Sequence, residues 1–412
     1  MTIGRRCPER LRAWWRRHRE LVLRAAILVM IGLAAEMLAG ELWRLVFSPG
    51  PGGAVDLKLR HVEVRRWFSG SPVYSELKDA VYPPATYSLL WPLIGWLSIE
   101  PARWLWAGTS ILALGGLTYL IIRQCRPLTV TESVLAALMM ISTNAVGVTI
   151  GNGQLLVHVL PSLLAGILLL RESGSSWRRE LSAVVLLLFS LVKLNGTAPF
   201  YWIVLFLPRH WRAKLAVAAG YIAATLVAVR YQPSGLKALL GQWLSRASAV
   251  GARDGYGHLG ILCTMLGVEG WLLPGSLVIL LGLGAWTFRY RRCDLWILLG
   301  VAGIVARLWT YHHLYDDILV VFPMVALLRQ AKRPGTSGMS DLLAGLLLGL
   351  ALATTLTPTR LFYSWPRPWP LLFSATHVIV WFAVLAFLLQ EARSQRTSPA
   401  KAIVGPELSP DR

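Results

Sequence analysis

The segment 311–317 reads Tyr-His-His-Leu-Tyr-Asp-Asp and places two histidines and two aspartates within seven residues. On a helix, His312 and His313 would lie four and three residues before Asp316, so these side chains could share one face. Such a cluster could bind a metal ion, or it could position a phosphate or an acceptor hydroxyl. No further residues at metal-ligand spacing accompany it. We therefore favour the second role and expect neither a metal nor a cofactor.

Two other charged residues lie next to apolar runs. Asp56 comes shortly after the first run, and a carboxylate there could accept the proton of a hydroxyl group as a general base. The alternative for Asp56 is a solvated loop carboxylate. Lys193 lies between the apolar runs 181–192 and 198–207. It is either a structural lysine whose ammonium group reaches the membrane surface or a point charge that binds a lipid phosphate.

Three further polar groups complete the candidate set. Tyr82 precedes two prolines, which stiffen the chain before an apolar stretch. Gln154 follows the sequence Gly-Asn-Gly at a junction between apolar runs, which is either a tight turn or a substrate contact. A later polar segment could line a substrate cleft with Arg253, Asp254, Tyr256 and His258.

These side chains must be positioned by a chain that consists mostly of apolar runs. The 412 residues are 55% hydrophobic and 15% charged, with a mean hydropathy of +0.54, whereas a soluble domain carries about 25% charged residues. A helical span needs roughly 20 apolar residues. Backbone polar groups inside a bilayer must be satisfied within the span, and the alternation of a transmembrane barrel is absent. We therefore predict an all-α polytopic membrane protein.

The net charge of +20 does not indicate a nucleic-acid partner. The arginines and lysines lie at the ends of apolar runs, where membrane topology requires them, and not on one soluble face. The four cysteines form no close pair in the sequence, so they predict no disulfide framework and no metal site.

The distribution of basic residues predicts the topology. A basic cytoplasmic tail, 1–20, precedes the first apolar run, 22–38, which we interpret as an uncleaved span rather than a signal peptide. Placing the later basic clusters inside as well gives about twelve spans within residues 21–390. Both termini are then cytoplasmic, and residues 391–412 form a disordered tail.

The same topology places the segments 48–86, 230–270 and 307–317 on the outer face. The apolar stretch 87–98 is too short to cross comfortably and contains Pro92, so we predict an interfacial helix there, after a first outer loop at 48–86. The runs 181–192 and 198–207 are also short. They predict a thin helical hairpin or a re-entrant pair with Lys193 at its apex.

The order of these motifs resembles that of the GT-C glycosyltransferases. More narrowly, it resembles glycosyltransferase family 87, the bacterial polyprenyl-phosphate-mannose-dependent α-mannosyltransferases. The resemblance covers residues 22–328, and the Gly-x-Pro-x-Tyr sequence at 70–74 belongs to it. It implies a GT-C-like bundle in the inner or plasma membrane that transfers a sugar, mannose by family default, with inversion. The implied partners are a polyprenyl-phosphate-linked donor, a glycolipid or glycan acceptor and the lipid bilayer.

The resemblance also implies roles for individual residues. Asp56 matches the catalytic aspartate of the first outer loop, and Lys193 matches a lysine after the central apolar run, although Leu-Asn-Gly replaces the expected proline-containing continuation. The doubled His and Asp residues leave two registers open for the late His/Asp motif. The expected substrate-binding residues are Tyr82, Gln154, Lys193, His312, His313 and Asp316. A phosphate leaving group needs a base and cations but no metal.

Two other classes of protein remain as alternatives. A secondary transporter would also have many spans, but it usually has inverted repeats and ionisable groups at the membrane midplane, whereas the polar groups here gather on one face. A polysaccharide polymerase or ligase would place its chemistry on one large, late, arginine-rich outer loop, whereas the first outer loop is the richest in this sequence.

Overall fold

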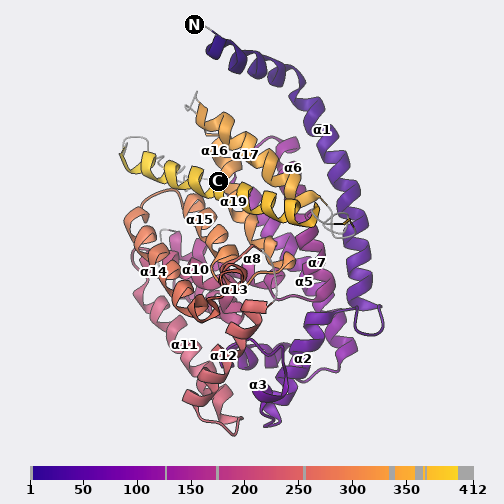
Figure 1. Cartoon of the computed structure of the whole chain (residues 1–412), viewed down its shortest axis with the longest axis vertical. Helices are drawn as coiled ribbons and strands as arrows, with labels where there is room; N and C mark the ends of the chain where they lie inside the picture. Colours follow the sequence, from indigo (N-terminus) through magenta and orange to yellow (C-terminus); the bar gives the residue numbers. More distant parts are fainter. Residues whose placement is uncertain are drawn as a thin grey trace.

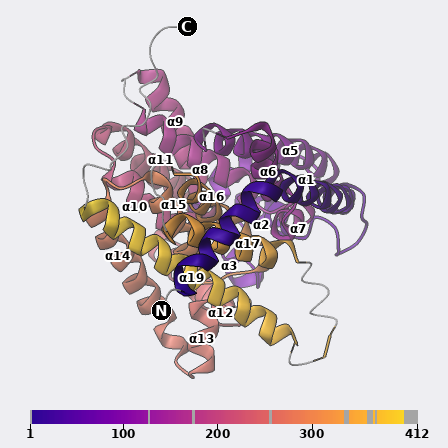
Figure 2. The same cartoon turned by 90° about the horizontal axis from the view of Figure 1, so that it is seen from above.

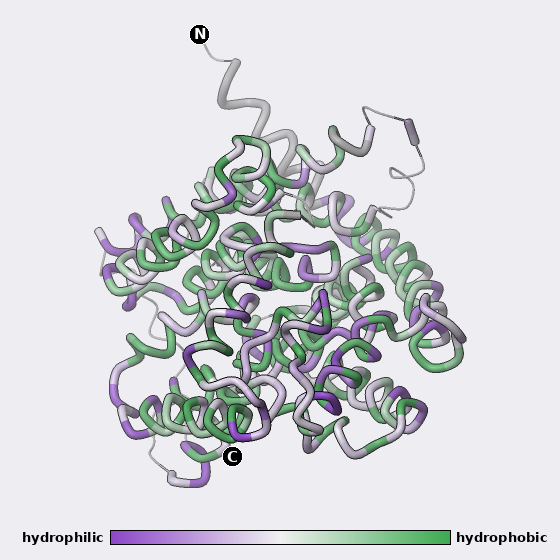
Figure 3. The backbone as a smooth tube through the Cα atoms, turned by 60° about the horizontal axis from the view of Figure 1, so that its bottom comes forward, coloured by the Kyte–Doolittle hydropathy of each residue, from purple (hydrophilic) through white to green (hydrophobic). Residues whose placement is uncertain are grey.

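The structure, a computed structural model, describes residues 3–125, 128–172, 176–253, 257–333, 339–357, 365–366 and 369–397. All regular elements within these residues are helices (Figure 1). Hydrophobic residues run along most of the helical stretches (Figure 3). The prediction of an all-α chain is therefore confirmed.

Seven helical stretches are long and apolar enough to cross a membrane, which is typical of a multi-pass membrane protein. An eighth is formed if α6 (Val130–Ile141) and α7 (Asn144–Asn152), which meet at a bend of 49°, make one span. The seven are Arg17–Val46 in α1 (Ile3–Val46), α5 (Ile99–Gln124), Trp177–Phe206, α11 (Trp211–Arg230), Glu269–Tyr290 with α14 (Leu272–Tyr290), α17 (Met339–Leu356), and Leu372–Thr397 in α19 (Trp369–Thr397).

The expected number of about twelve spans is not confirmed. That count includes the apolar runs 155–170, 295–306 and 318–328. They form the short helices α8 (Leu156–Arg171), α15 (Leu295–Leu308) and α16 (Val321–Ala331), of 16, 14 and 11 residues. At 1.5 Å per residue, even the longest is about 24 Å long, less than the roughly 30 Å of a bilayer core. Most of their side chains are buried. They are therefore core elements enclosed by the longer helices.

The stretch Trp177–Phe206 folds back on itself at Lys193, between α9 (Trp177–Ser190) with the 3₁₀ turn η2 (Leu191–Lys193) and α10 (Leu194–Phe206). Lys193 itself has a non-helical backbone, with φ −115° and ψ 72°. The hydroxyl group of Tyr201 donates to the carbonyl oxygen of Leu187, fourteen residues earlier. In one straight helix these residues would lie about 21 Å apart. The chain therefore turns back at Lys193, as either the predicted hairpin or the predicted re-entrant pair requires, and the stretch passes as one crossing by length and composition only.

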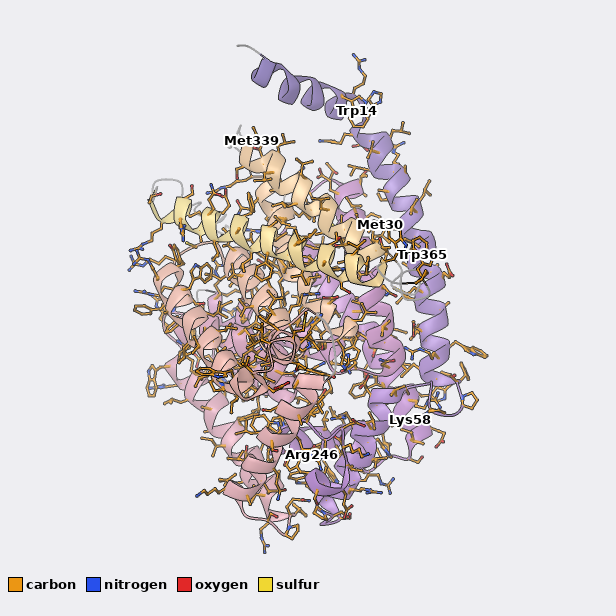
Figure 4. All side chains as sticks on the ribbon, in the orientation of Figure 1. Trp14, Met30, Lys58, Arg246, Met339 and Trp365 are labelled. Carbon is orange, nitrogen blue, oxygen red and sulfur yellow. The ribbon has the colours of Figure 1, made fainter. Side chains whose placement is uncertain are left out.

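The contacts between loops divide the bundle into two ends. At one end, predicted to be cytoplasmic, Arg329 bonds to the carbonyl of Gln124 and Lys332 pairs with Glu132 at 2.5 Å. At the other end, Arg246 donates to the carbonyl of Tyr74 at 2.7 Å. Figure 4 shows Lys58 and Arg246 at this second end, far from Trp14 and Met339. The structure thus groups the loops as the basic clusters predict.

The segment 48–86, predicted as a polar loop, contains the helices α2 (Val55–Phe68) and α3 (Val73–Glu76). The buried residues of α2 include Leu57, Val64 and Trp67, whose spacing of seven and three forms one stripe of a helix. The predicted interfacial helix 87–98 begins earlier than expected. It consists of α4 (Pro84–Leu90) and the π-helical turn η1 (Trp91–Gly95), and it packs against α11 while Trp91 stays exposed.

The segment 230–270 is also more ordered than a loop, since it holds α12 (Leu236–Arg253) and α13 (Leu259–Met265). The predicted N-terminal tail is helical from Ile3 onward. This part of α1 extends beyond the bundle (Figure 1) and lies across its end when seen from above (Figure 2). The predicted C-terminal tail is helical as far as Thr397, with Ala392 buried, and residues 398–412 lie outside the described part.

Candidate active site

A cavity of ≈ 530 Å³ lies where the three segments predicted to face outward meet. One wall is polar and includes Asp56, Gln154 and Lys193. The opposite wall comes from α12 and α14 and is mainly apolar, with Trp243, Leu244, Ala247, Val250, Leu272, Leu273, Leu277 and Leu280. Leu273 and Leu277 are 49% and 54% exposed. The apolar wall therefore continues onto the outer surface of the bundle.

Asp56 lies in the first turn of α2 and lines the cavity. Its side chain lies close to that of Gln154, which favours the ionised carboxylate. Burial raises the pKa of the Asp56 carboxyl above its ordinary value, and the positive charges of Arg60 and Lys193 oppose this rise. A half-buried carboxylate with a raised pKa is a good candidate for a general base.

Lys193 forms the centre of the polar wall, at the apex of the hairpin. Its ammonium group lies 2.5 Å from Asp316 Oδ1 and donates to Gln154 Oε1 at 3.2 Å. It also lies 5.0 Å from the ring centroid of Tyr315. Lys193 and Asp316 are each only 3% exposed. The structure thus brings three predicted site residues into one bonded cluster, and Asp56 lies beside it in the same cavity.

A glycine turn positions Gln154. Gly153 ends α7 with φ 69°, a left-handed conformation that favours glycine. A Cβ atom at this position would lie 2.6 Å from the Cβ of Leu57. The carbonyl of Gly151 accepts a hydrogen bond from the N–H group of Ala54 at 3.2 Å. This turn therefore packs directly on the start of α2, two residues from Asp56.

The doubled residues of segment 311–317 point in two directions. His313 and Tyr315 line the cavity, and Asp316, which bonds to Lys193, accepts the backbone N–H of His313 at 3.0 Å. His312 is fully buried behind the cavity, where its Nε2 lies 2.9 Å from Asp317 Oδ1. Of the two histidines, only His313 has the placement expected of a substrate contact.

Asp317 belongs to a second ionic cluster that the sequence did not reveal. Arg307 of α15 donates to Asp317 Oδ1 at 2.7 Å, and its side chain is 0% exposed. His377 of α19 lies close enough to influence the same carboxyl group. The Arg307–Asp317 pair ties α15 to the segment that carries His313 and Asp316.

Arg60 is a second functional candidate that sequence reasoning missed. It lies one helical turn after Asp56 and lines the cavity. Its guanidinium group packs 4.4 Å from the ring centroid of Tyr82, which also lines the cavity, and it lies 2.8 Å from Glu63 Oε1. The spacing of four residues between Asp56 and Arg60 was the available signal.

The remaining predicted residues are placed less centrally. His258 caps α13 by accepting from the N–H of Gly260 and is buried against Tyr311. The side chain of Arg253 and all of Asp254 and Tyr256 lie outside the described residues. Among the residues described, no group of three or more His, Cys, Asp or Glu side chains could hold a metal ion.

The sequence model of glycosyltransferase family 87 matches residues 80–315, more than half of the chain. The chain therefore belongs to glycosyltransferase family 87 and is a membrane glycosyltransferase. The matched region includes Tyr82, Gln154, Lys193, His312 and His313. Asp316 is the first residue after it, whereas Asp56 lies 24 residues before its start. Neither the curated proteins nor the solved structures include a match to the chain.

Proposed function

We propose that this glycosyltransferase moves a sugar from a polyprenyl-phosphate donor to a hydroxyl group of a glycolipid or glycan acceptor. The cavity carries this proposal, because its apolar wall reaches the surface of the bundle while its polar wall holds Asp56 and Lys193. Such a cavity suits a ligand with an isoprenoid chain on one side and a charged sugar phosphate on the other. Mannose is the sugar expected for the family.

Lys193 is the proposed contact for the donor phosphate. Its charge is balanced by Asp316 at 2.5 Å. A phosphate oxygen can take the place of Asp316 as the acceptor of a charge-assisted hydrogen bond. The Lys193 charge then stabilises the negative charge that develops on the departing phosphate. Tyr82, Gln154 and His313 are the other proposed substrate contacts.

Asp56 is the proposed general base. It takes the proton of the acceptor hydroxyl as that oxygen attacks the anomeric carbon of the donor sugar. The bond from the anomeric carbon to the phosphate oxygen breaks, and the phosphate leaves with the bonding electron pair. One displacement of this kind inverts the anomeric configuration. All groups that this step requires are side chains of the polar wall, so the proposed mechanism needs no metal.

The cavity end of the bundle is the proposed outer face of the inner or plasma membrane, because the basic loops gather at the opposite end. Cysteine labelling in intact cells tests this orientation in a background without native cysteines. Asp79→Cys, at an exposed site beside the cavity, should react with a membrane-impermeant reagent. Reaction only after permeabilisation would reverse the proposed topology.

The decisive experiment is a transfer assay with purified protein. A panel of polyprenyl-phosphate sugars is offered with glycolipid and glycan acceptors, and products are identified by mass spectrometry. We expect transfer from one donor and no transfer by Asp56→Asn, with donor binding retained. Transfer from nucleotide sugars alone would overturn the proposed donor class. Uptake of a solute without any transfer product would favour the transporter alternative.

A further inference from the structure

The carboxylate of Asp56 faces an unusual mixture of charges. It must be ionised to act as a base, yet it is partly buried beside an apolar cavity, where burial favours the protonated form. Several titratable or charged side chains surround Asp56. They are Arg60 and Glu63 of α2, Asp79 and Tyr82, Lys193 of the hairpin, and Tyr311, His313, Tyr315 and Asp316.

Only two of these groups are cations with a permanent charge, and they differ in how that charge is balanced. Lys193 lies 2.5 Å from Asp316, so much of its field at Asp56 is cancelled. Arg60 lies 2.8 Å from Glu63, but burial raises the pKa of Glu63 to about 7, against the lowering effect of Arg60. Burial therefore favours the neutral form of Glu63, and a neutral Glu63 does not cancel the charge of Arg60.

Arg60 lies near enough for this charge to act on Asp56, although the two side chains form no ion pair. The two residues are four positions apart on α2, which places them on the same face one turn apart. Both line the cavity, and Arg60 is only 5% exposed, so water screens the interaction weakly. Its contact with the Tyr82 ring and its hydrogen bond to the carbonyl of Asp79 at 3.1 Å fix the guanidinium group in place.

We infer that Arg60 is the positioning residue that keeps Asp56 ionised, so that Asp56 can accept the proton of the acceptor hydroxyl. This inference rests on the proposed role of Asp56 as the base. In this inference Arg60 affects catalysis by changing the ionisation of Asp56, and it does not bind either substrate. A purely structural role, in which Arg60 only pairs with Glu63, makes a different prediction, because removing either partner of that pair would then have the same effect.

The test is the pH profile of kcat/KM, whose acidic limb follows the ionisation of the base in the free enzyme. Arg60→Met and Arg60→Gln should both move this limb to higher pH by about one unit. Arg60→Lys, which keeps the charge, should move it much less. Glu63→Gln, which imitates the protonated carboxyl group, should leave it in place. Arg66→Met on the same helix is the control, since Arg66 is exposed and pairs with Glu76 at 3.2 Å.

The outcomes separate this inference from the proposed function. An acidic limb that stays in place in a folded neutral Arg60 variant would overturn the inference, as would equal shifts in the Arg60 and Glu63 variants. If Arg60→Met does not fold, Arg60→Gln decides. Asp56→Asn is measured in parallel. Full activity of Asp56→Asn would remove Asp56 as the base, whereas an inactive Asp56→Asn together with an unmoved limb would refute only the role of Arg60.

Discussion

The Lys193–Asp316 pair and the Arg307–Asp317 pair use adjacent aspartates of one short segment, but they lie in different surroundings. Lys193 borders the cavity and shares its ammonium group between Asp316 and Gln154. Arg307 and Asp317 lie behind the cavity lining, together with the fully buried His312. A ligand can reorganise the first pair, whereas the second is enclosed by helices. The difference indicates that the first pair serves binding and the second fixes the segment that presents it.

The largest expected effect comes from breaking the enclosed pair. Asp317→Asn removes a negative charge 2.7 Å from a fully buried guanidinium group, and breaking a buried ion pair costs about 3–5 kcal/mol. We expect a strong fall in the yield of folded protein and in its thermal midpoint. Asp316→Asn should cost clearly less, because the cavity lets water approach Lys193. Equal midpoints for the two variants, measured in detergent, would remove the distinction between the pairs.

Lys193→Ala tests the binding role of the first pair. A hydrogen bond to a charged group contributes about 1.5–3 kcal/mol, so the KM for the lipid donor should rise by roughly 10- to 150-fold. Lys193→Arg should retain part of the affinity. The thermal midpoint controls for folding. An unchanged donor KM and kcat in folded Lys193→Ala would make the lysine structural.

The two histidines should respond in opposite ways to the same replacement. His313→Gln alters the cavity lining, and we expect about a tenfold lower kcat/KM with a nearly normal thermal midpoint, since a positioned side chain contributes modestly on its own. His312→Gln weakens the contact with Asp317, so the midpoint should fall while the folded fraction keeps its kcat. The reverse pattern would exchange the roles assigned to His312 and His313.

Gly153→Ala is expected to have the smallest effect. A left-handed backbone costs a residue with a Cβ atom about 1–2 kcal/mol, and the new methyl group would press on Leu57. The displaced Gln154 should lower turnover a few-fold. Gly270→Ala, where a Cβ atom meets nothing within 4 Å, is the matched control. Similar kinetics for both variants would show that the turn does not position Gln154.

The sequence predicted the helical class, the turn at Lys193 and the grouping of the loops, because long apolar runs and basic clusters are visible directly in the order of the residues. It did not predict α2, since this helix lies outside the apolar runs and carries many charges. Its signal was the buried stripe of Leu57, Val64 and Trp67, which is visible only when a helical period is tested on polar segments.

The site could be predicted in part. Lys193, Gln154 and Asp316 were candidates, and they lie in hydrogen-bonding contact. The sequence could not predict which histidine and which aspartate of the doubled residues belong to the cavity, because two identical neighbours give no information about which one faces it. Arg307 was missed for a related reason. An arginine at the end of an apolar helix resembles a topological charge, and only packing reveals that it is buried with Asp317.

The hairpin also relates the site to the thickness of the bilayer. Its arms have 14 and 13 residues, so each is about 21 Å long or less, roughly 9 Å shorter than a hydrocarbon core of about 30 Å. In the proposed orientation, Lys193 therefore lies below the plane of the lipid phosphates, and a donor phosphate must descend through the cavity to reach it. A thinner bilayer would shorten this descent, so the proposed orientation predicts that bilayer thickness affects access of the lipid donor to the site.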